Sequence, residues 1–445
     1  MTAAPRLRAT AVPGGHSVPV HIQSQVPSRP TTAGQPDITG SAAAVLRAVL
    51  DHGPVARTLI GRATGLSPAA VSRQTADMIS LGLLREVPVS TDPPRAGRPF
   101  VPLDIDTRHH IACGVHIAVP FITFSLVDLR GRVLAEENMP HHGAPGEVLR
   151  QIGEHVPRFT ARHCRGSRPV GLGVVTGGRV DPRRGVILEH GLLGWRDVPV
   201  RQVLAAATSL PVHVDGHARA LAQAEILFGD QRARRSLVHL FVGNVVDAAI
   251  ATGGTVHHGR HCGAGDVAHL QLTDVPVTCP CGRSGCLQAA ISEQTLVDRA
   301  IRAGLIQSPD MASLVEVARR GDPGALALVR DRLRIVGRVV AMLLDMIDPE
   351  VLVLTECTTI FLPELLADLY EEIAAHSRLR DSPELTVLPS SFGPQALAVA
   401  AGAAVLDAVH RSPRSLRATD NRGRGVAGLG HAPRVVVDGR HPTPG

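Results

Sequence analysis

The sequence contains no lysine, so every basic side chain other than histidine is an arginine. Arginines number 46 and acidic residues 40, which gives a formal net charge of +6 over 445 residues. This balance is compatible with an anionic partner, but it is too mild to identify nucleic acid without further signals.

Hydrophobic runs of membrane-spanning length are also missing. The most apolar stretch, residues 336–354, is interrupted by an arginine, a proline and three acidic residues, so it cannot cross a bilayer as an uncharged helix. The first 15 residues have no apolar core of the kind found in secretory signals. We therefore expect a soluble, cytoplasmic protein.

Cysteine is scarce, yet three of the seven cysteines lie within residues 279–286, CPCGRSGC. Clustered cysteines in the cytosol indicate metal or redox chemistry more often than a disulfide framework. A structural zinc ion takes four thiolate or imidazole ligands. Cys279, Cys281 and Cys286 supply three, and His269 is the nearest upstream histidine of suitable type. A Cys279–Cys286 disulfide and free thiols are the alternatives to the predicted zinc site.

A chain of this length is too long for one compact core, so two or three domains are expected. Residues 1–37 and 412–445 are rich in proline, glycine and arginine and are predicted to be disordered tails. Their arginines are either simply solvated or attract DNA phosphates weakly, without regard to sequence. Between the tails, we place one domain at 38–105 and a larger one at 106–411.

The sequence pattern of the smaller domain predicts a winged helix-turn-helix. Ser67 is a natural N-cap for the third predicted helix, and Pro68 occupies its first position. Two short apolar segments then flank a basic, turn-rich loop, as the strands of a wing would. The three helices are predicted over residues 41–53, 57–65 and 66–82. A small helical interaction domain without DNA contact is the alternative.

The third helix is the predicted reader of double-stranded DNA, because small residues on its exposed face would let it lie in a major groove. Arg73 is the best candidate for a guanine edge and Gln74 the next, while Ser72, Arg95 and Arg98 are expected to hold phosphates. The full set of predicted DNA-contacting residues is Ser67, Ser72, Arg73, Gln74, Arg95 and Arg98.

The larger domain has an α/β pattern with a weak internal duplication. Three consecutive strands are predicted over 111–139 and again over 236–259, and helices with single strands follow each triple. Such a duplication predicts two similar lobes with a cleft between them.

Several segments of this domain resemble the ROK family, which unites sugar kinases and sugar-responsive repressors. The resemblance covers residues 40–410, and its motifs read GLGVVTGGRVDPRRGVIL (171–188), PVHVDGHARALAQAEILFG (211–229) and AHLQLTDVPVTCPCGRSGCLQ (268–288). It implies a winged helix-turn-helix followed by a two-lobed, actin-like and ribonuclease-H-like domain. It also implies a homodimer or homotetramer and a metal-binding histidine beside the sugar.

Compared with the family's kinases, the phosphate-binding turns are degraded. They read His116 to Pro120, Gly243 to Ala248 and Thr355 to Cys357, and Glu356 in the last would repel a phosphate. The family's catalytic Asn-Asp pair aligns with Gly216 and His217. We therefore expect neither catalysis nor ATP binding. The alternative is an active, ATP-dependent sugar kinase of the ROK family.

The effector pocket has changed as well, since Asp266 and Gln288 stand where the family has glutamates. The predicted effector-binding residues are Gly216, His217, Asp266, His269 and Gln288. The resulting hypothesis is a repressor of carbohydrate-related genes that senses a sugar or sugar phosphate. A further possibility is a constitutive regulator that is controlled by a protein partner.

Overall fold

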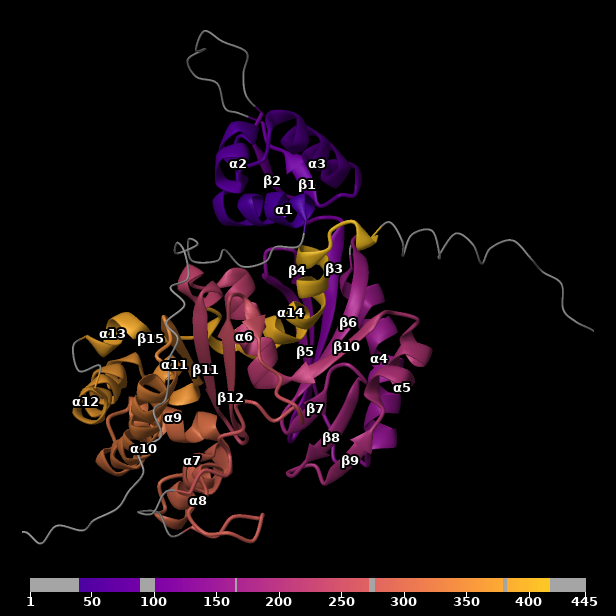
Figure 1. Ribbon diagram of the computed structural model, residues 1–445. Coiled ribbons are helices and arrows are strands. Elements are labelled where there is room, and N and C mark those ends of the chain that lie inside the picture. The colour runs from indigo at the N-terminus through magenta and orange to yellow at the C-terminus, as the bar shows by residue number, and fades with distance from the viewer. Residues whose placement is uncertain (1–39, 89–100, 165, 272–276, 379–381, 417–445) are drawn as a thin grey trace, which may run out of the picture. The chain divides into compact units, whose positions relative to one another are not determined.

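The computed structural model describes residues 40–88, 101–164, 166–271, 277–378 and 382–416 (Figure 1). The predicted tails lie outside these ranges except for residues 412–416. In that short piece, Arg414 donates hydrogen bonds to Gln74 and Asp77, at 3.0 and 2.8 Å. The predicted disorder therefore does not extend to the first residues of the C-terminal tail.

A winged helix-turn-helix follows, as the sequence predicts. The apolar face of the first helix is buried through Val45, Leu46 and Val49, and Gly65 ends the second helix with a φ of 70°, in the left-handed region that favours glycine. Its elements are α1 (Ser41–His52), α2 (Arg57–Thr64), α3 (Pro68–Ser80) and the antiparallel strands β1 (Leu84–Glu86) and β2 (Leu103–Ile105).

Two five-stranded sheets with matching strand order form the core of the larger domain (Figure 1). The first has the order β10-β6-β3-β4-β5 and the second the order β13-β12-β11-β14-β15. In each, an antiparallel meander of three strands continues into two parallel strands, which confirms the predicted duplication. The strands are β3 (His110–Ile117), β4 (Phe121–Asp128), β5 (Val133–Pro140), β6 (Arg168–Thr176), β10 (Val212–Gly216), β11 (Ser236–Val242), β12 (Val246–Thr252), β13 (Thr255–Val256), β14 (Val351–Glu356) and β15 (Val387–Pro389).

A small third sheet was not predicted. Its strands are β7 (Arg179–Asp181), β8 (Val186–His190) and β9 (Trp195–Val198), which pair in antiparallel order. They are only three to five residues long and carry little alternation for a sequence pattern to detect.

Helix α14 (Ala396–Arg411) packs so closely on the first sheet that two strands need glycine beneath it. A Cβ atom on Gly173 would lie 1.9 Å from the carbonyl oxygen of Ala401, and one on Gly114 would lie 2.8 Å from the Cβ of that alanine. The remaining helices are α4 (Pro145–His163), α5 (Val200–Thr208), α6 (His217–Phe228), α7 (Leu287–Ile291), α8 (Glu293–Arg302), α9 (Met311–Arg319), α10 (Pro323–Ile347), α11 (Cys357–Phe361), α12 (Leu366–His376) and α13 (Pro383–Thr386).

The apolar stretch 336–354 is divided between the end of α10 and β14. Asp348 breaks the helix with a φ of 50°, and the strand begins at Val351. Among the described helices, none combines the length and the apolar character needed to cross a membrane.

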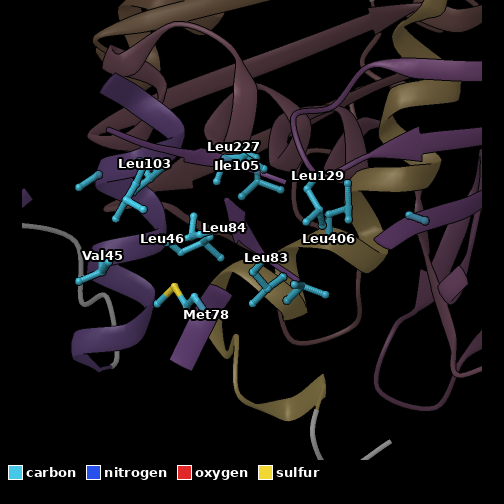
Figure 2. Close-up of a cluster of buried hydrophobic side chains, with 14 of the residues drawn as sticks. Val45, Leu46, Met78, Leu83, Leu84, Leu103, Ile105, Leu129, Leu227 and Leu406 are labelled. Carbon is cyan, nitrogen blue, oxygen red and sulfur yellow. The ribbon is translucent and has the colours of Figure 1, made fainter. Parts of the chain in front are cut away.

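One hydrophobic cluster joins the winged helix to the domain that follows it (Figure 2). Its labelled members from the winged helix include Leu46, Met78 and Leu103, and those from the larger domain are Leu129, Leu227 and Leu406. Each such leucine contributes about 1.5–3 kcal/mol when it is fully buried. The two parts are therefore connected by a packed core as well as by the chain.

Candidate functional site

Helix α3 presents the side chains expected of a DNA reader. The Ser67 hydroxyl accepts a hydrogen bond from the backbone N–H of Ala70, at 3.3 Å, which caps the helix as predicted. Ser72, Arg73 and Ala76 are exposed. The opposite face is buried against the rest of the winged helix, so the exposed face is the one available to a groove.

Gln74 does not lie on that exposed face, which corrects the prediction that it is free to read a base. It is 5% exposed, its Nε2 donates to the Ser41 hydroxyl at 2.7 Å, and its Oε1 accepts from Arg414 at 3.0 Å. Both ends of the amide are thus engaged within the protein. The other predicted contacts, Arg95 and Arg98, lie outside the described residues.

The structure gathers the four predicted metal ligands. One ligand atom from each of His269, Cys279, Cys281 and Cys286 lies within 4.8 Å of all the others. The Cys279 sulfur is 3.7 Å from His269 Nδ1, and the sulfurs of Cys281 and Cys286 are also 3.7 Å apart. Sequence spacing thus identified a set of side chains that can hold a metal ion.

The local fold explains why these residues converge. Isolated β-bridges join Gln271 to Cys286 and Thr278 to Ser284, so the segment folds back on itself. Gly282 and Gly285 have φ angles of 86° and 74°, conformations that favour glycine. The three sulfurs and one imidazole are the donor set of a structural zinc site.

Two of these thiols differ in their proton affinity. Hydrogen bonds from the backbone and side chain of Arg283 lower the pKa of Cys281 to about 6, whereas burial raises the pKa of Cys286 to about 11. A bound cation deprotonates a coordinating thiol outright. A cation at this site would hold all three cysteines as thiolates.

The predicted effector residues divide into two groups. Asp266 is exposed, and its carboxylate accepts a hydrogen bond from the backbone N–H of Ala268, at 3.3 Å. The side-chain oxygen of Gln288 accepts from the backbone N–H of Val246, at 3.2 Å. Asp266 precedes His269 and Gln288 follows Cys286, so the two residues flank the segment that carries the metal ligands.

Asp247 is a polar residue near Asp266 that sequence reasoning did not assign to the site. Burial raises the pKa of Asp247 to about 8, while Arg219 lowers it and the carboxylates of Asp266 and Asp215 raise it further. Arg219 is in turn held by Asp215, with Nε 2.7 Å from the carboxylate. Asp247 thus interacts with the Arg219 guanidinium and with two further carboxylates, Asp215 and Asp266. In the sequence, Asp247 lies within the second degraded phosphate turn, residues 243–248.

The second group of predicted effector residues consists of Gly216 and His217. They lie where β10 ends and α6 begins. The His217 side chain is 3% exposed and packs against Phe241, with ring centroids 4.3 Å apart and ring planes tilted by 51°. Burial lowers the pKa of His217 well below its usual value, and His116 and His190 lower it further. The imidazole is therefore neutral at pH 7.

The three degraded phosphate turns all border one cavity of about 270 Å³, which also contains His217. Glu356, however, does not act as predicted. It is 1% exposed, forms an ion pair with the buried Arg332, and accepts from the backbone N–H of Thr359 at 2.8 Å. Its charge is compensated and its oxygens cap α11. The expected repulsion of a phosphate by Glu356 is therefore wrong, because its charge is already paired with Arg332.

Comparison with known proteins gives two family matches. Residues 112–407 match the ROK family, and residues 37–92 match the MarR family. The transcriptional regulator Rv0485 of Mycobacterium tuberculosis (strain ATCC 25618 / H37Rv) is 31% identical over 392 residues, covering 84% of this chain and 86% of the relative. The DNA-binding transcriptional repressor Mlc of Escherichia coli (strain K12) is 26% identical, covering 70% and 79%.

Solved structures share the fold. A ROK family transcriptional regulator described as a homologue of the Escherichia coli Mlc protein superposes with a TM-score of 0.67 at 23% identity, covering 83% of this chain and 96% of that one. A ROK family glucokinase from Streptomyces griseus, solved with glucose and AMPPNP, gives 0.58 at 24% identity, covering 66% and 98%. With two matching five-stranded sheets behind a winged helix, and with most of its length matched, this chain belongs to the ROK family.

Proposed function

We propose that the protein is a DNA-binding transcriptional regulator whose ROK domain senses a small molecule and transfers no phosphoryl group. The observation that carries this proposal is the exposed face of α3, with Ser72 and Arg73 on a capped helix of a winged helix-turn-helix. Two relatives, a transcriptional regulator and a DNA-binding transcriptional repressor, support the same proposal.

In this function α3 enters the major groove of an operator. Arg73 pairs with a guanine edge, and Ser67 and Ser72 hold phosphates near the start of the helix. Arg95 and Arg98 of the wing add phosphate contacts. Binding to a chromosomal operator also means that the protein acts in the cytoplasm, and we infer that it represses carbohydrate-related genes.

A structural zinc ion is the metal that the cluster of His269, Cys279, Cys281 and Cys286 suits best. Three thiolates and an imidazole match its preference for a closed tetrahedral site. When bound, zinc would supply rigidity and no reaction chemistry. The residues of the loop would then hold Asp266 and Gln288 in place, since metal ligation fixes the backbone that carries them.

The effector we infer is a sugar or sugar phosphate that lies against Asp266, His269 and Gln288. Adjacent hydroxyl groups pair well with carboxylates and amides, and unpaired polar groups in a buried site are costly. Binding would favour a closed arrangement of the two lobes in a homodimer or homotetramer. The spacing of the two winged helices would then no longer match the operator half-sites.

Catalytic inactivity is supported by the residues around the cavity. Phosphoryl transfer needs a backbone cradle for phosphates, a magnesium site and a base beside the sugar hydroxyl. Here proline and branched side chains occupy the first turn, Pro120 and Val119 among them, and His217 stands in the place of the family's catalytic aspartate. The alternative of an active sugar kinase is favoured only by the fold shared with kinases.

Selection of DNA fragments tests the regulatory function. Full-length protein is mixed with sheared genomic DNA of its own host, and the retained fragments are sequenced. We expect a few loci to be enriched, each carrying two related half-sites whose centres lie about one helical turn apart or a multiple of it. Retention of all fragments alike, with loss of all of them in moderate salt, would contradict sequence-specific regulation.

A further inference from the structure

The cavity bordered by the three degraded turns lies at the carboxyl ends of parallel strands of both five-stranded sheets. His116 and Ile117 belong to β3, Val242 to β11 and Thr355 to β14. Crevices at this edge of an α/β sheet are a common place for ligands. At about 270 Å³, the cavity falls below the roughly 300 Å³ at which pockets for drug-sized ligands begin. A molecule that fills this space alone is smaller than a nucleotide.

The walls of this cavity are apolar. Phe241, Val245, Ile360, Phe361 and Leu397 contribute aromatic and aliphatic surface. Among the residues that line it in the described part of the chain, none is an arginine, and Glu293 carries the only carboxylate. A phosphate or another anion would find no cationic partner there and would lie against hydrocarbon, which is costly.

Two histidines supply polar atoms that have no partner. His116 Nε2 and both ring nitrogens of His217 are buried without a hydrogen bond among the described residues. The two side chains are 6% and 3% exposed, and their ring centroids lie 6.0 Å apart. Burial lowers the pKa of His116 to about 4 and that of His217 well below the usual value.

Both imidazoles are consequently neutral at pH 7, and each neutral ring offers one donor and one acceptor. Leaving such buried groups without a hydrogen-bond partner is unfavourable. A hydroxyl group can donate to one ring and accept from another. An anion can only accept, and a pure hydrocarbon can do neither.

We propose that this cavity is a binding site for a small, uncharged and largely apolar molecule with one hydroxyl group, held between His116 and His217. Asp266, His269 and Gln288, to which the sugar effector is assigned, are not among the residues that line this cavity. The inference rests on the proposed function in one respect, because it names a second class of ligand that the sensing domain takes.

Three naphthalene derivatives test this site on the full-length protein without DNA. Binding of 2-naphthol, naphthalene and naphthalene-2-sulfonate is measured at pH 7 by the fluorescence of the ring. We expect saturable binding of 2-naphthol at one site per chain, naphthalene several-fold weaker, and the sulfonate at least ten-fold weaker.

The His217→Phe variant tests the assignment of the hydroxyl. It keeps a ring against Phe241 but loses both nitrogens. We expect the affinity for 2-naphthol to fall about five- to ten-fold, while the affinity for naphthalene changes less than about two-fold, since its apolar contacts stay. His376→Phe, on the exposed face of α12, is the matched control and should leave all three affinities unchanged.

The site would be refuted by a lack of saturable 2-naphthol binding, by equal binding of the sulfonate, or by an unchanged 2-naphthol affinity in the His217→Phe variant. If that variant fails to fold, the order of the three compounds on the unmodified protein still decides. Because DNA is absent from the measurement, failure of operator binding would contradict the proposed function and leave this result standing.

Discussion

Asp51 at the end of α1 forms a two-pronged ion pair with Arg234 of the larger domain. The two guanidinium nitrogens of Arg234 each lie 2.7 Å from a different carboxylate oxygen of Asp51. Their side chains are only 17% and 12% exposed. Arg47 lies beside them, 3.8 Å from the same carboxylate, and burial with the charge of Arg234 lowers its pKa to about 10. One carboxylate therefore holds two guanidinium groups together at the base of the winged helix.

Replacing that carboxylate should weaken the connection between the two domains. Asp51→Asn leaves two nearly buried guanidinium groups close together, and we expect a loss of about 2 kcal/mol in the free energy of unfolding. Urea unfolding followed by circular dichroism measures it. The control is Asp368→Asn, which breaks the exposed pair with Arg330 and should cost less than about 0.5 kcal/mol. If the two variants lost the same free energy of unfolding, the Asp51 ion pair would stabilise the protein no more than an exposed ion pair does.

Substitution of the neighbouring α3 residues Arg73 and Gln74 should affect different properties, DNA binding in the first case and folding stability in the second. Arg73→Ala should cost about 1–3 kcal/mol of specific DNA binding and relax the preference at one base pair, with unchanged thermal stability. Gln74→Ala should cost about 1–2 kcal/mol of folding stability, because Ser41 and Arg414 lose their partner, with unchanged base preference. Binding to a selected operator and to variants of it, with melting curves, separates the two effects. If the Gln74→Ala variant preferred different bases in the operator, Gln74 would contact a base after all.

The wing arginines should act without regard to sequence. Arg95→Ala or Arg98→Ala should weaken binding to all DNA fragments alike and reduce the slope of affinity against salt by about one phosphate contact. Fluorescence anisotropy at several salt concentrations provides the measurement. A loss confined to one operator sequence would assign these side chains to base readout instead.

The protein should purify with about one zinc ion per chain without added metal, since a Cys3His site binds zinc tightly at neutral pH. Cys281→Ser should lose the metal and the response to effector, while DNA binding persists because α3 lies far from the metal loop in the sequence. Cys164→Ser, at a cysteine outside the cluster, should keep the metal. Elemental analysis decides, and a preparation without zinc but with reduced, titratable thiols would rule out the metal site.

One buried histidine should make stability depend on pH in a defined direction. His239 is fully buried, its Nε2 lies 3.0 Å from the Thr355 hydroxyl, and burial lowers its pKa to about 3. Below about pH 6.5 the unfolded chain binds a proton at this residue and the folded protein does not, so stability falls as pH falls.

Relative to His239→Gln, the unmodified protein should therefore lose about 2 kcal/mol more in the free energy of unfolding between pH 7 and pH 5. Urea unfolding at three pH values measures the difference, with His376→Gln as a surface control. Parallel pH profiles for the unmodified protein and His239→Gln would show that His239 takes up a proton in the folded state.

Local patterns in the sequence were sufficient for much of the architecture. The Ser67-Pro68 cap, the repeated strand triple and the spacing of the cysteines each depend on residues close together in the chain, and each has its counterpart in the structure. The internal duplication predicted the two lobes, His269 was predicted as the nearest upstream histidine, and the family resemblance agreed with both.

What the sequence could not supply depends on distant partners. Gln74 looked available until the structure placed Arg414, 340 positions away, against its amide. Glu356 looked like a repulsive charge until Arg332, buried in α10, was found to neutralise it. The apolar cavity that contains His116 and His217 is likewise lined by residues of both sheets and of α14. Because these residues lie far apart in the chain, no single segment of the sequence could predict the cavity.

We propose that this ROK domain keeps the fold of a sugar kinase without its phosphoryl chemistry. ADP formation by the purified, zinc-loaded protein, with ATP, magnesium and each of the common hexoses, tests it most directly, with a ROK family glucokinase assayed alongside. We predict no sugar-dependent ADP above background, no change in the His217→Ala variant, and no activity gained in His217→Asp. Sugar-dependent turnover by the unmodified protein that disappears in His217→Ala would contradict the account and establish an active kinase.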